Sequence, residues 1–431
     1  MQTSPYAITK VRARSILDSR GNPTVQVDVT TQGGFGRFSV PSGASKGQYE
    51  AVELRDNVKA KFHGMGVSKA VGNVEKILGP AILRTDSRNQ EEIDRRLNKL
   101  DGTKDKSHLG ANAILGVSMA VARAQADTKR VPFYKGLQTR RKPALPVPLM
   151  NILNGAKHAG NALSFQEFLI IPSGFSRFRD AIRSGSEVYH TLGRILKERY
   201  GRNATNVGDE GGYAPPFDKV DKALELVNEA VEESGYSAGK EVSLGIDAAA
   251  DSFYSPDKNI YTPDGKNHTR EELFDFYLAL TEKFHLKSIE DPFQDNDFNA
   301  FAKLTKRIGS KTQIIADDLF VTNKSRIEKG VRIGAGNALL AKLNQAGTLT
   351  ETISGIEAAR SAGYGIVISH RSGETEDTSI ADVSVGLASG QIKTGAPARG
   401  ERTAKYNRLL EIEEELGPRA RYYGRSFLKG L

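Results

Sequence analysis

The chain has 431 residues, which is long for one ordinary domain but fits a large barrel beside a smaller domain. Hydrophobic residues make up 38% and charged residues 26%, a balance typical of globular proteins, and the lack of cysteine excludes disulfide scaffolds, thiolate metal sites and cysteine nucleophiles. The net charge of +9 suits an anionic partner, but the basic residues are scattered, which favours a solvated cationic surface over a nucleic-acid interface.

The beginning of the chain carries no recognisable targeting signal. Residues 1–14 contain no apolar segment ahead of a cleavage site. No apolar run approaches the ~18 residues that a membrane-spanning helix needs. We therefore expect the protein to act in the cytoplasm.

The first part of the chain is predicted to hold strands followed by helices. Residues 24–29 alternate valine with polar residues, the period of a half-buried strand, and Phe38 and Val40 indicate another strand. Ser87 is expected to cap a helix that stops at Gly102. Strands followed by helices are typical of an α+β domain.

A proline-dense segment, residues 143–148, follows a helical pattern rich in alanine. We place a domain boundary there, which divides the chain into an N-terminal α+β capping domain, 1–142, and a second domain, 143–431.

The second domain alternates short apolar runs with amphipathic helices, one of which begins at a capping box formed by Thr269 and Glu272. The candidate strands lie roughly 25 to 45 residues apart, as in repeated βα units. They are 241–246, 286–289, 313–316, 338–341, 365–368 and 390–392. This pattern predicts an α/β fold with a (β/α)8 barrel of the TIM type.

Each of these apolar runs is followed by a polar residue. In chain order these are Asp247, Glu290, Asp317, Lys342, the group 369–372 (Ser-His-Arg-Ser) and Lys393. A single acid after a strand is usually a turn residue or a helix cap. An ordered succession of acids and bases is poorly explained by turns, and barrel active sites lie at the carboxyl ends of the strands. The sequence therefore predicts an active site at this end of the barrel.

Three of these residues, Asp247, Glu290 and Asp317, are carboxylates that can meet at one point. Without a cation they would repel one another, and oxygen ligands suit Mg²⁺. A network of ion pairs with Lys342 and Lys393 is the alternative, but it leaves the phosphate-binding chemistry described next without a purpose.

Two lysines and the group after the fifth run supply further chemistry. Lys342 and Lys393 are expected to face one cavity, where each cation disfavours the charge of the other, so that one can be neutral and act as a base. Arg371 can bind a phosphate with two hydrogen bonds, and the hydroxyl of Ser372 lies beside it. A surface ion pair is the alternative for Arg371.

Two glycine-bounded loops add candidate residues. Residues 206–215 place Glu210 between glycines, which allow the backbone to approach closely. Residues 154–160 contain His158 and come shortly before Gln166 and Glu167. A lone histidine is more often structural than functional, but its place in this loop favours a role in the pocket.

Together these motifs resemble the enolase family along essentially the whole chain. The segments that carry the resemblance are 19–24, 42–45, 208–215, 288–292, 317–323, 342–345, 369–375 and 392–397. The resemblance implies a small α+β domain packed on a modified barrel. It also implies the reversible dehydration of 2-phosphoglycerate to phosphoenolpyruvate, a step of glycolysis and gluconeogenesis that uses two magnesium ions.

The same resemblance implies a role for each candidate residue. Asp247, Glu290 and Asp317 look like ligands of one Mg²⁺, and Ser45 resembles the ligand of the second. Lys342 looks like the base that removes the C2 proton, and Glu210 looks like the acid that assists loss of the C3 hydroxyl. The remaining residues resemble contacts to the substrate or the lining of its pocket: His158, Gln166, Glu167, His370, Arg371, Ser372 and Lys393.

The family also implies a homodimer or a larger homo-oligomer such as an octamer, and a secondary presence at the cell surface. The chain departs from the family pattern at Lys46, where a small hydroxyl residue is usual in the loop that closes over substrate. A barrel dehydratase for acid sugars and a binding protein built on the same scaffold stay open as alternatives at this point.

Overall fold

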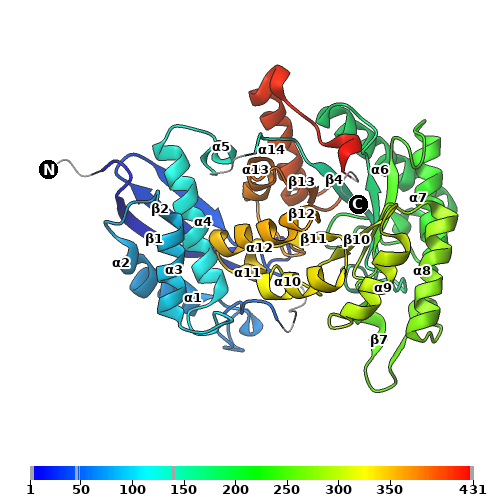
Figure 1. The fold of residues 1–431 in the computed structure, drawn as a ribbon, viewed down its shortest axis with the longest axis horizontal. Coiled ribbons are helices and arrows are strands. Elements are labelled where there is room, and N and C mark those ends of the chain that lie inside the picture. Colours follow the sequence, from blue (N-terminus) through cyan, green and yellow to red (C-terminus); the bar gives the residue numbers. More distant parts are fainter. Residues whose placement is uncertain (1–3, 44–46, 48, 138–140, 428–431) are drawn as a thin grey trace.

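The computed structural model describes residues 4–43, 47, 49–137 and 141–427. Its N-terminal part lies beside a larger closed barrel (Figure 1). The elements of the N-terminal part are β1 (Ile8–Leu17), β2 (Pro23–Thr31), β3 (Phe35–Ser39), α1 (Ser68–Asn73), α2 (Gly79–Ile82), α3 (Gln90–Asp101), α4 (Ala111–Thr128) and α5 (Phe133–Gly136).

The strands β1, β2 and β3 form an antiparallel sheet with β2 in the centre, and α4 packs on β2 and β3. The predicted strand is confirmed, since Val25, Val27 and Val29 are completely buried within β2. The helix can approach the sheet closely because β3 carries Gly36, where an added Cβ atom would lie 2.1 Å from the carbonyl oxygen of Ala120. The apolar face of the sheet therefore forms the core of this part.

The predicted helix between Ser87 and Gly102 is present as α3, but its beginning differs from the expectation. It ends as predicted at Gly102, which adopts the left-handed conformation (φ 75°). The prediction that Ser87 caps the helix is wrong, because the helix begins after Asn89. The N–H of Ser87 instead donates to the carbonyl oxygen of Tyr6, 2.9 Å away, which ties this residue to the chain ahead of β1.

The barrel closes through eight strands in the order β10-β11-β12-β13-β4-β5-β6-β9. These strands are β4 (Val147–Asn154), β5 (Glu167–Ile171), β6 (Ser243–Asp247), β9 (Ser288–Glu290), β10 (Gln313–Ala316), β11 (Ala338–Ala341), β12 (Gly365–Ser369) and β13 (Gly390–Lys393), and the short β7 (Tyr254–Ser255) and β8 (Ile260–Tyr261) form a separate hairpin. The helices are α6 (Phe178–Tyr200), α7 (Val220–Glu233), α8 (Arg270–Phe284), α9 (Phe298–Ile308), α10 (Lys324–Ile333), α11 (Leu343–Ala346), α12 (Leu349–Ser361), α13 (Ser379–Gly386) and α14 (Gly400–Leu416).

The barrel confirms the predicted fold class and all six predicted strands, as well as the capping box at the start of α8. Two strands escaped prediction, β4 and β5. The proline-dense segment at which the domain boundary was placed runs into β4, where Pro148 pairs with Ile392 of β13. Strand β5 runs antiparallel to both β4 and β6, whereas the other neighbours in the barrel are parallel. This reversal is what makes the barrel a modified one.

Layers of side chains fill the barrel interior. One is apolar and includes Val147, Leu169, Ile315 and Val367, all completely buried. Nearer the amino-terminal ends of these strands, the side-chain amides of Gln313 and Gln391 exchange two hydrogen bonds, of 2.9 Å and 2.7 Å. Because alternate residues of a strand face the same side, the residues two positions beyond this pair, Ile315 and Lys393, also point inward. The charged residues therefore lie at the mouth, above a closed floor.

The N-terminal part packs against the barrel through polar contacts. The Asp94 carboxylate accepts hydrogen bonds from the N–H and the hydroxyl of Thr350, at 3.0 Å and 2.6 Å. Ser42 forms a β-bridge with Gly373, in the segment that follows β12. Among the described residues, the helices are all too short or too polar to span a lipid bilayer.

A charged cluster on the polar face of the N-terminal sheet generates the first prediction. Asp28 accepts hydrogen bonds from Arg14 (2.6 Å) and Arg37 (2.7 Å) on the flanking strands. Although burial acts in the opposite direction, the two guanidinium groups lower the pKa of Asp28 from 3.8 to about 2. The pair energy is thus present above about pH 4 and is lost as the pH falls towards 2.

We expect Asp28→Asn to reduce the free energy of unfolding at pH 7 by about 1 kcal/mol, since solvent screens these partly exposed pairs. Urea unfolding at pH 7 and pH 3 measures this change, which should shrink at pH 3. Asp257→Asn, at an exposed position between β7 and β8, is the control and should change stability by less than about 0.5 kcal/mol. An equal loss at both pH values would contradict the assignment.

Candidate active site

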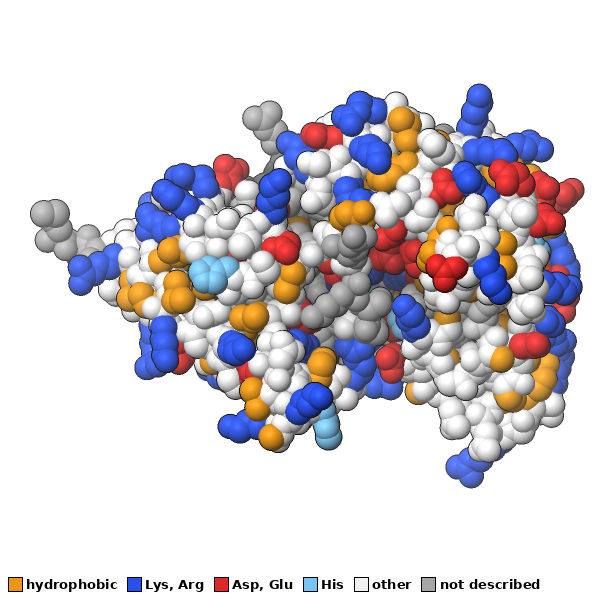
Figure 2. Space-filling model, turned by 90° about the horizontal axis from the view of Figure 1, so that it is seen from below, with side chains coloured by type: hydrophobic (Ala, Val, Ile, Leu, Met, Phe, Trp, Pro, Cys, Tyr) orange, Lys and Arg blue, Asp and Glu red, His pale blue; other side chains and the backbone are white. Residues whose placement is uncertain are grey.

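A polar pocket lies at the mouth of the barrel and encloses about 650 Å³ of non-protein space, part of it open to solvent. Acidic side chains gather in the central hollow of the molecule, while Lys and Arg side chains are spread over the face around it (Figure 2). Of the predicted site residues that the structure describes, all but Glu290 line this pocket. Ser45, the predicted ligand of a second metal ion, and Lys46 lie outside the described residues.

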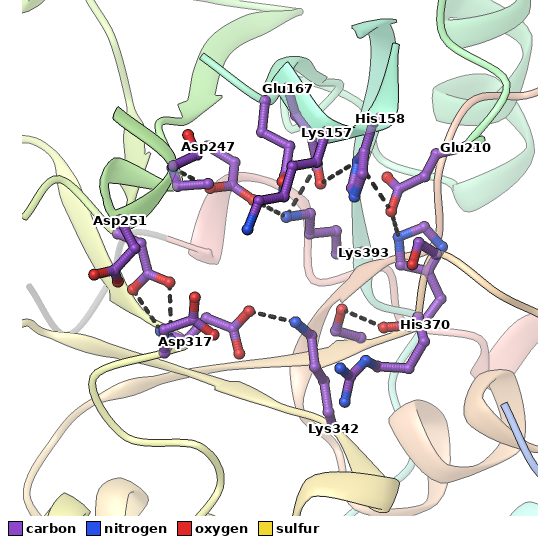
Figure 3. Close-up of a pocket in the computed structure, with 18 of the residues that line it drawn as sticks. Lys157, His158, Glu167, Glu210, Asp247, Asp251, Asp317, Lys342, His370 and Lys393 are labelled. Atoms are coloured by element: carbon purple, nitrogen blue, oxygen red, sulfur yellow. Dashed lines mark hydrogen bonds and ion pairs between the residues drawn. The ribbon is translucent and has the colours of Figure 1, made fainter. Parts of the chain in front are cut away.

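Lys393 is the central cation of the pocket (Figure 3). Its Nζ lies 2.9 Å from Asp247, 2.8 Å from Glu290 and 3.0 Å from Glu167. These carboxylates come from neighbouring strands in register, with Glu167 opposite Asp247 and Asp247 opposite Glu290. Glu290 lies behind Lys393, completely buried. Because β5 is antiparallel to its neighbours, its first residue, Glu167, reaches the same end of the barrel as the last residues of β6 and β9.

Lys342 follows β11 and forms an ion pair with Asp317, which follows β10. The other oxygen of Asp317 accepts a hydrogen bond of 3.0 Å from the side-chain amide of Gln345. Gln345 in turn accepts one of 2.8 Å from the hydroxyl of Thr322, and that hydroxyl accepts the N–H of Lys342 at 2.9 Å. This closed ring of contacts fixes both members of the ion pair.

The sequence predicted that each lysine disfavours the charge of the other, but their carboxylate neighbours have the larger effect. Burial favours a neutral amine, but Asp317 raises the pKa of Lys342 above its ordinary value. Against the same effect of burial, Asp247 and the neighbouring carboxylates raise the pKa of Lys393 well above its ordinary value. The mutual repulsion of the two lysines is therefore outweighed, because each ammonium has its own carboxylate partners.

Glu210, on the glycine-rich loop, lies among hydrogen-bond donors. Its Oε2 accepts a hydrogen bond of 3.0 Å from the side-chain amide of Asn151, and its Oε1 lies 3.3 Å from Nε2 of His370 and 3.5 Å from Nδ1 of His158. Although burial opposes them, the two imidazoles hold the pKa of Glu210 well below its ordinary value. By contrast, burial and the nearby Glu210 charge raise the pKa of Glu167. The surroundings thus shift the pKa values of the two carboxyl groups in opposite directions.

The glycines of this loop let the backbone approach its neighbours closely, as the sequence predicted. A Cβ atom at Gly208 would lie 2.3 Å from the carbonyl oxygen of His158, and one at Gly212 would lie 2.8 Å from the side chain of Asn154. Only glycine lets this loop lie directly on the loop of His158.

Arg371 and Ser372 line the pocket as predicted, and both are buried. Arg371 forms an ion pair of 3.0 Å with Glu50, from the N-terminal part, and donates a hydrogen bond of 3.0 Å to Asn344. The N-terminal part therefore contributes a carboxylate to the wall of the pocket. The alternative of a surface ion pair for Arg371 is excluded by this burial.

The acidic residues of the pocket fit a hard divalent cation. Oε1 of Glu290 is buried and has no hydrogen-bond partner among the described residues, which is costly for a carboxylate oxygen and is relieved by a cation. Two further groups of side chains have ligand atoms within 4.8 Å of one another and can hold a metal ion. They are His158 with Glu167 and Glu210, and Asp291 with Asp317 and Asp318. The predicted trio is not gathered as closely, because its members face the two lysines.

Comparisons with known proteins agree with this geometry. The chain matches the family models "Enolase, N-terminal domain" over residues 8–137 and "Enolase, C-terminal TIM barrel domain" over residues 142–431. It is 55% identical over 416 residues to an enolase of Methanopyrus kandleri, covering 96% of this chain and 97% of the relative. It is 53% identical over 426 residues to an enolase of Pyrococcus furiosus, covering 99% of each. The chain belongs to the enolase family.

Enolases are hydro-lyases, and the reaction of this chain is the reversible dehydration of 2-phosphoglycerate to phosphoenolpyruvate, that of a phosphopyruvate hydratase. This membership sets aside the acid-sugar dehydratase that the sequence left open. The substrate is accordingly a small phosphorylated acid, which agrees with the placement of Arg371 in the pocket.

Several polar residues of this enolase site were not predicted from the sequence. Asn151 lies in β4, a strand that was not predicted. Gln345 is the last residue of the segment 342–345 that carries the family resemblance, so its place in this motif was the only signal available. Glu50 follows the loop 42–47 in the N-terminal part, and its approach to Arg371 depends on how that part packs on the barrel.

The Glu50–Arg371 contact leads to the second prediction. Both side chains are less than a tenth exposed, so removing the carboxylate leaves a buried cation less well compensated. We expect Glu50→Gln to lower the free energy of unfolding by about 2 kcal/mol, measured by urea unfolding. Glu357→Gln, which removes an exposed partner of Arg360, should cost less than about 0.5 kcal/mol. Equal effects of the two changes would show that Glu50 does not stabilise Arg371.

Proposed function

We propose that Lys342 removes the C2 proton of 2-phosphoglycerate and that Glu210 delivers a proton to the departing C3 hydroxyl. The observation that carries this proposal is that both side chains reach one buried pocket from different elements, each held by its own ring of polar contacts. A base and an acid fixed in separate places can act on adjacent carbon atoms of one substrate.

Asp247, Glu290 and Asp317 would hold one Mg²⁺, and Ser45 would complete the site of a second. When bound, the ions stabilise the negative charge that develops on the substrate carboxylate as the C2 proton leaves. With an ion held by Asp317, this carboxylate would no longer serve Lys342 alone as a counter-charge, which would favour the neutral amine that accepts a proton.

The remaining pocket residues would bind and orient the substrate. Arg371 and Ser372 are suited to the phosphate, since a guanidinium can donate two parallel hydrogen bonds to it. Gln166 and Lys393 would contact other oxygen atoms of the substrate. The pocket around the C3 end of the substrate would be lined by His158, Glu167 and His370, beside Glu210.

Glu210 must gain a proton before it can act as an acid, since its carboxylate is strongly favoured without substrate. An anionic substrate placed beside it disfavours a further negative charge and so raises its proton affinity. Burial, which already favours the protonated form, then acts in the same direction. Glu210 would therefore be protonated, and able to act as an acid, only when substrate occupies the pocket.

We further infer that the chain acts in the cytoplasm as a homodimer or a larger homo-oligomer such as an octamer, and that nucleic acid is not its partner. The scattered distribution of Lys and Arg supports the last point (Figure 2). A secondary presence at the cell surface stays an expectation.

The third prediction concerns the metal. The purified protein should convert 2-phosphoglycerate to phosphoenolpyruvate in the presence of Mg²⁺, followed by the absorbance of the conjugated product. A chelator should stop the reaction and fresh Mg²⁺ should restore it, because the carboxylates alone cannot stabilise the developing charge. Undiminished turnover after exhaustive chelation would refute the role of the ion.

The fourth prediction separates the two proton-transfer roles. Lys342→Ala should abolish exchange of the C2 proton with deuterated solvent, whereas Glu210→Gln should retain exchange while losing dehydration by on the order of 100-fold or more. Nuclear magnetic resonance of the substrate measures exchange, and product absorbance measures dehydration. Equal loss of exchange in both variants would contradict the assignment.

A further inference from the structure

A completely buried arginine, Arg402 of α14, lies directly behind the pocket. One of its nitrogen atoms, Nη1, lies 2.7 Å from Nδ1 of His370 and donates a hydrogen bond of 2.7 Å to the carbonyl oxygen of Arg371. The other, Nη2, donates to the carbonyl oxygen atoms of Ser372, at 2.6 Å, and Asp209, at 3.1 Å. A single guanidinium group thus contacts both the segment after β12 and the loop that carries Glu210.

The contact with His370 determines where that ring carries its proton. A guanidinium group can only donate hydrogen bonds, so Nδ1 of His370 must accept through its lone pair. The proton of the neutral imidazole is then on Nε2, which lies 3.3 Å from Oε1 of Glu210. His370 therefore turns an N–H towards Glu210 on one side of the ring, at ion-pair distance and without full hydrogen-bond geometry, while it accepts from Arg402 on the other.

The surroundings of His370 keep the ring neutral. The charged groups that face it are Glu210, Arg402 and Glu374, and the charge of Glu374 is compensated by Lys405 of α14 at 3.0 Å. Burial, together with the Arg402 cation, lowers the pKa of His370 to about 4 despite the nearby Glu210. The ring does not gain a second proton at physiological pH.

We propose that Arg402 is a positioning residue, which holds His370 as the neutral Nε2–H tautomer and through it orients the Glu210 carboxyl group. Asn151 donates a hydrogen bond to one oxygen of that group, and Nε2 of His370 lies 3.3 Å from the other. The same guanidinium holds the backbone of Arg371 and Ser372, which keeps the proposed phosphate-binding end at a set distance from the proposed acid. The consequence for catalysis rests on the acid role proposed for Glu210, whereas the tautomer does not.

The tautomer can be measured directly in the unmodified enzyme. Nitrogen-15 labelling of histidine gives signals for the seven histidines of the chain, and His370→Gln identifies the one that matters. We expect a protonated Nε2, an unprotonated Nδ1 and no titration between pH 6 and 8. A proton on Nδ1, or a titration near the ordinary value of about 6.5, would overturn the proposal whatever the role of Glu210.

Substitutions test the consequence for catalysis. Arg402→Met should lower dehydration on the order of 100-fold while retaining exchange of the C2 proton, because the acid is misplaced and the base is not. His370 should then titrate nearer to 6.5, so that activity falls as the pH drops through that value. Arg402→Lys, which keeps the charge but cannot serve all the acceptors at once, should recover part of the activity.

The matched control is Arg408→Met, on the same helix. Arg408 is bound to Asp382 and to surface glutamates and contacts neither His370 nor the segment after β12. It should leave exchange, dehydration and the state of His370 unchanged. Parallel loss of exchange and dehydration in Arg402→Met, with His370 unaltered, would reduce Arg402 to a structural residue and refute the proposal. Should Arg402→Met fail to fold, the measurement on the unmodified enzyme and Arg402→Lys still decide.

Discussion

The mouth of this barrel depends on one buried ammonium group, that of Lys393, placed among the carboxylates of Asp247, Glu290 and Glu167. Removing such charges from water costs several kcal/mol each, so none of the three carboxylates could be buried here without a cation. The arrangement requires β5, β6 and β9 to keep their register, because a slip of one residue would turn each carboxylate to the other face. Strand pairing and site electrostatics are therefore the same constraint.

The sequence was informative wherever function is attached to the carboxyl end of a parallel strand. Asp247, Asp317, Lys342 and Lys393 each end or follow a short apolar run, so period and spacing alone locate them. Glu167 breaks this rule, because it begins a strand that runs the other way. Strand direction is decided by pairing across the barrel, and no local sequence pattern in β5 predicts it. The same holds for β4, whose proline suggested a domain boundary although Pro148 lies within the closed barrel.

The site residues that could not be predicted from the sequence are those that hold or orient the predicted catalytic and binding residues. Glu50 meets Arg371 and Gln345 only after the N-terminal part has packed on the barrel. In the sequence, Arg402 is one of several charges on a helix rich in charged residues, beside Glu401 and close to Lys405. Burial and hydrogen bonding distinguish it, and both are properties of the folded chain. Sequence patterns thus locate the groups that react and miss the groups that orient them.

Orientation matters here because the two ends of the substrate are bound by different parts of the fold. The phosphate would meet the segment after β12, and the departing hydroxyl would meet a loop more than 150 residues earlier in the chain. Contacts within either segment cannot fix the distance between them. Arg402 donates to carbonyl oxygen atoms of both, at Ser372 and Asp209, from a helix that belongs to neither. A planar cation with several donors can tie two irregular segments together through their backbone carbonyl groups, and a lysine offers too few directions to do so. The helix that follows the last barrel strand is thereby also the element that sets the spacing of the active site.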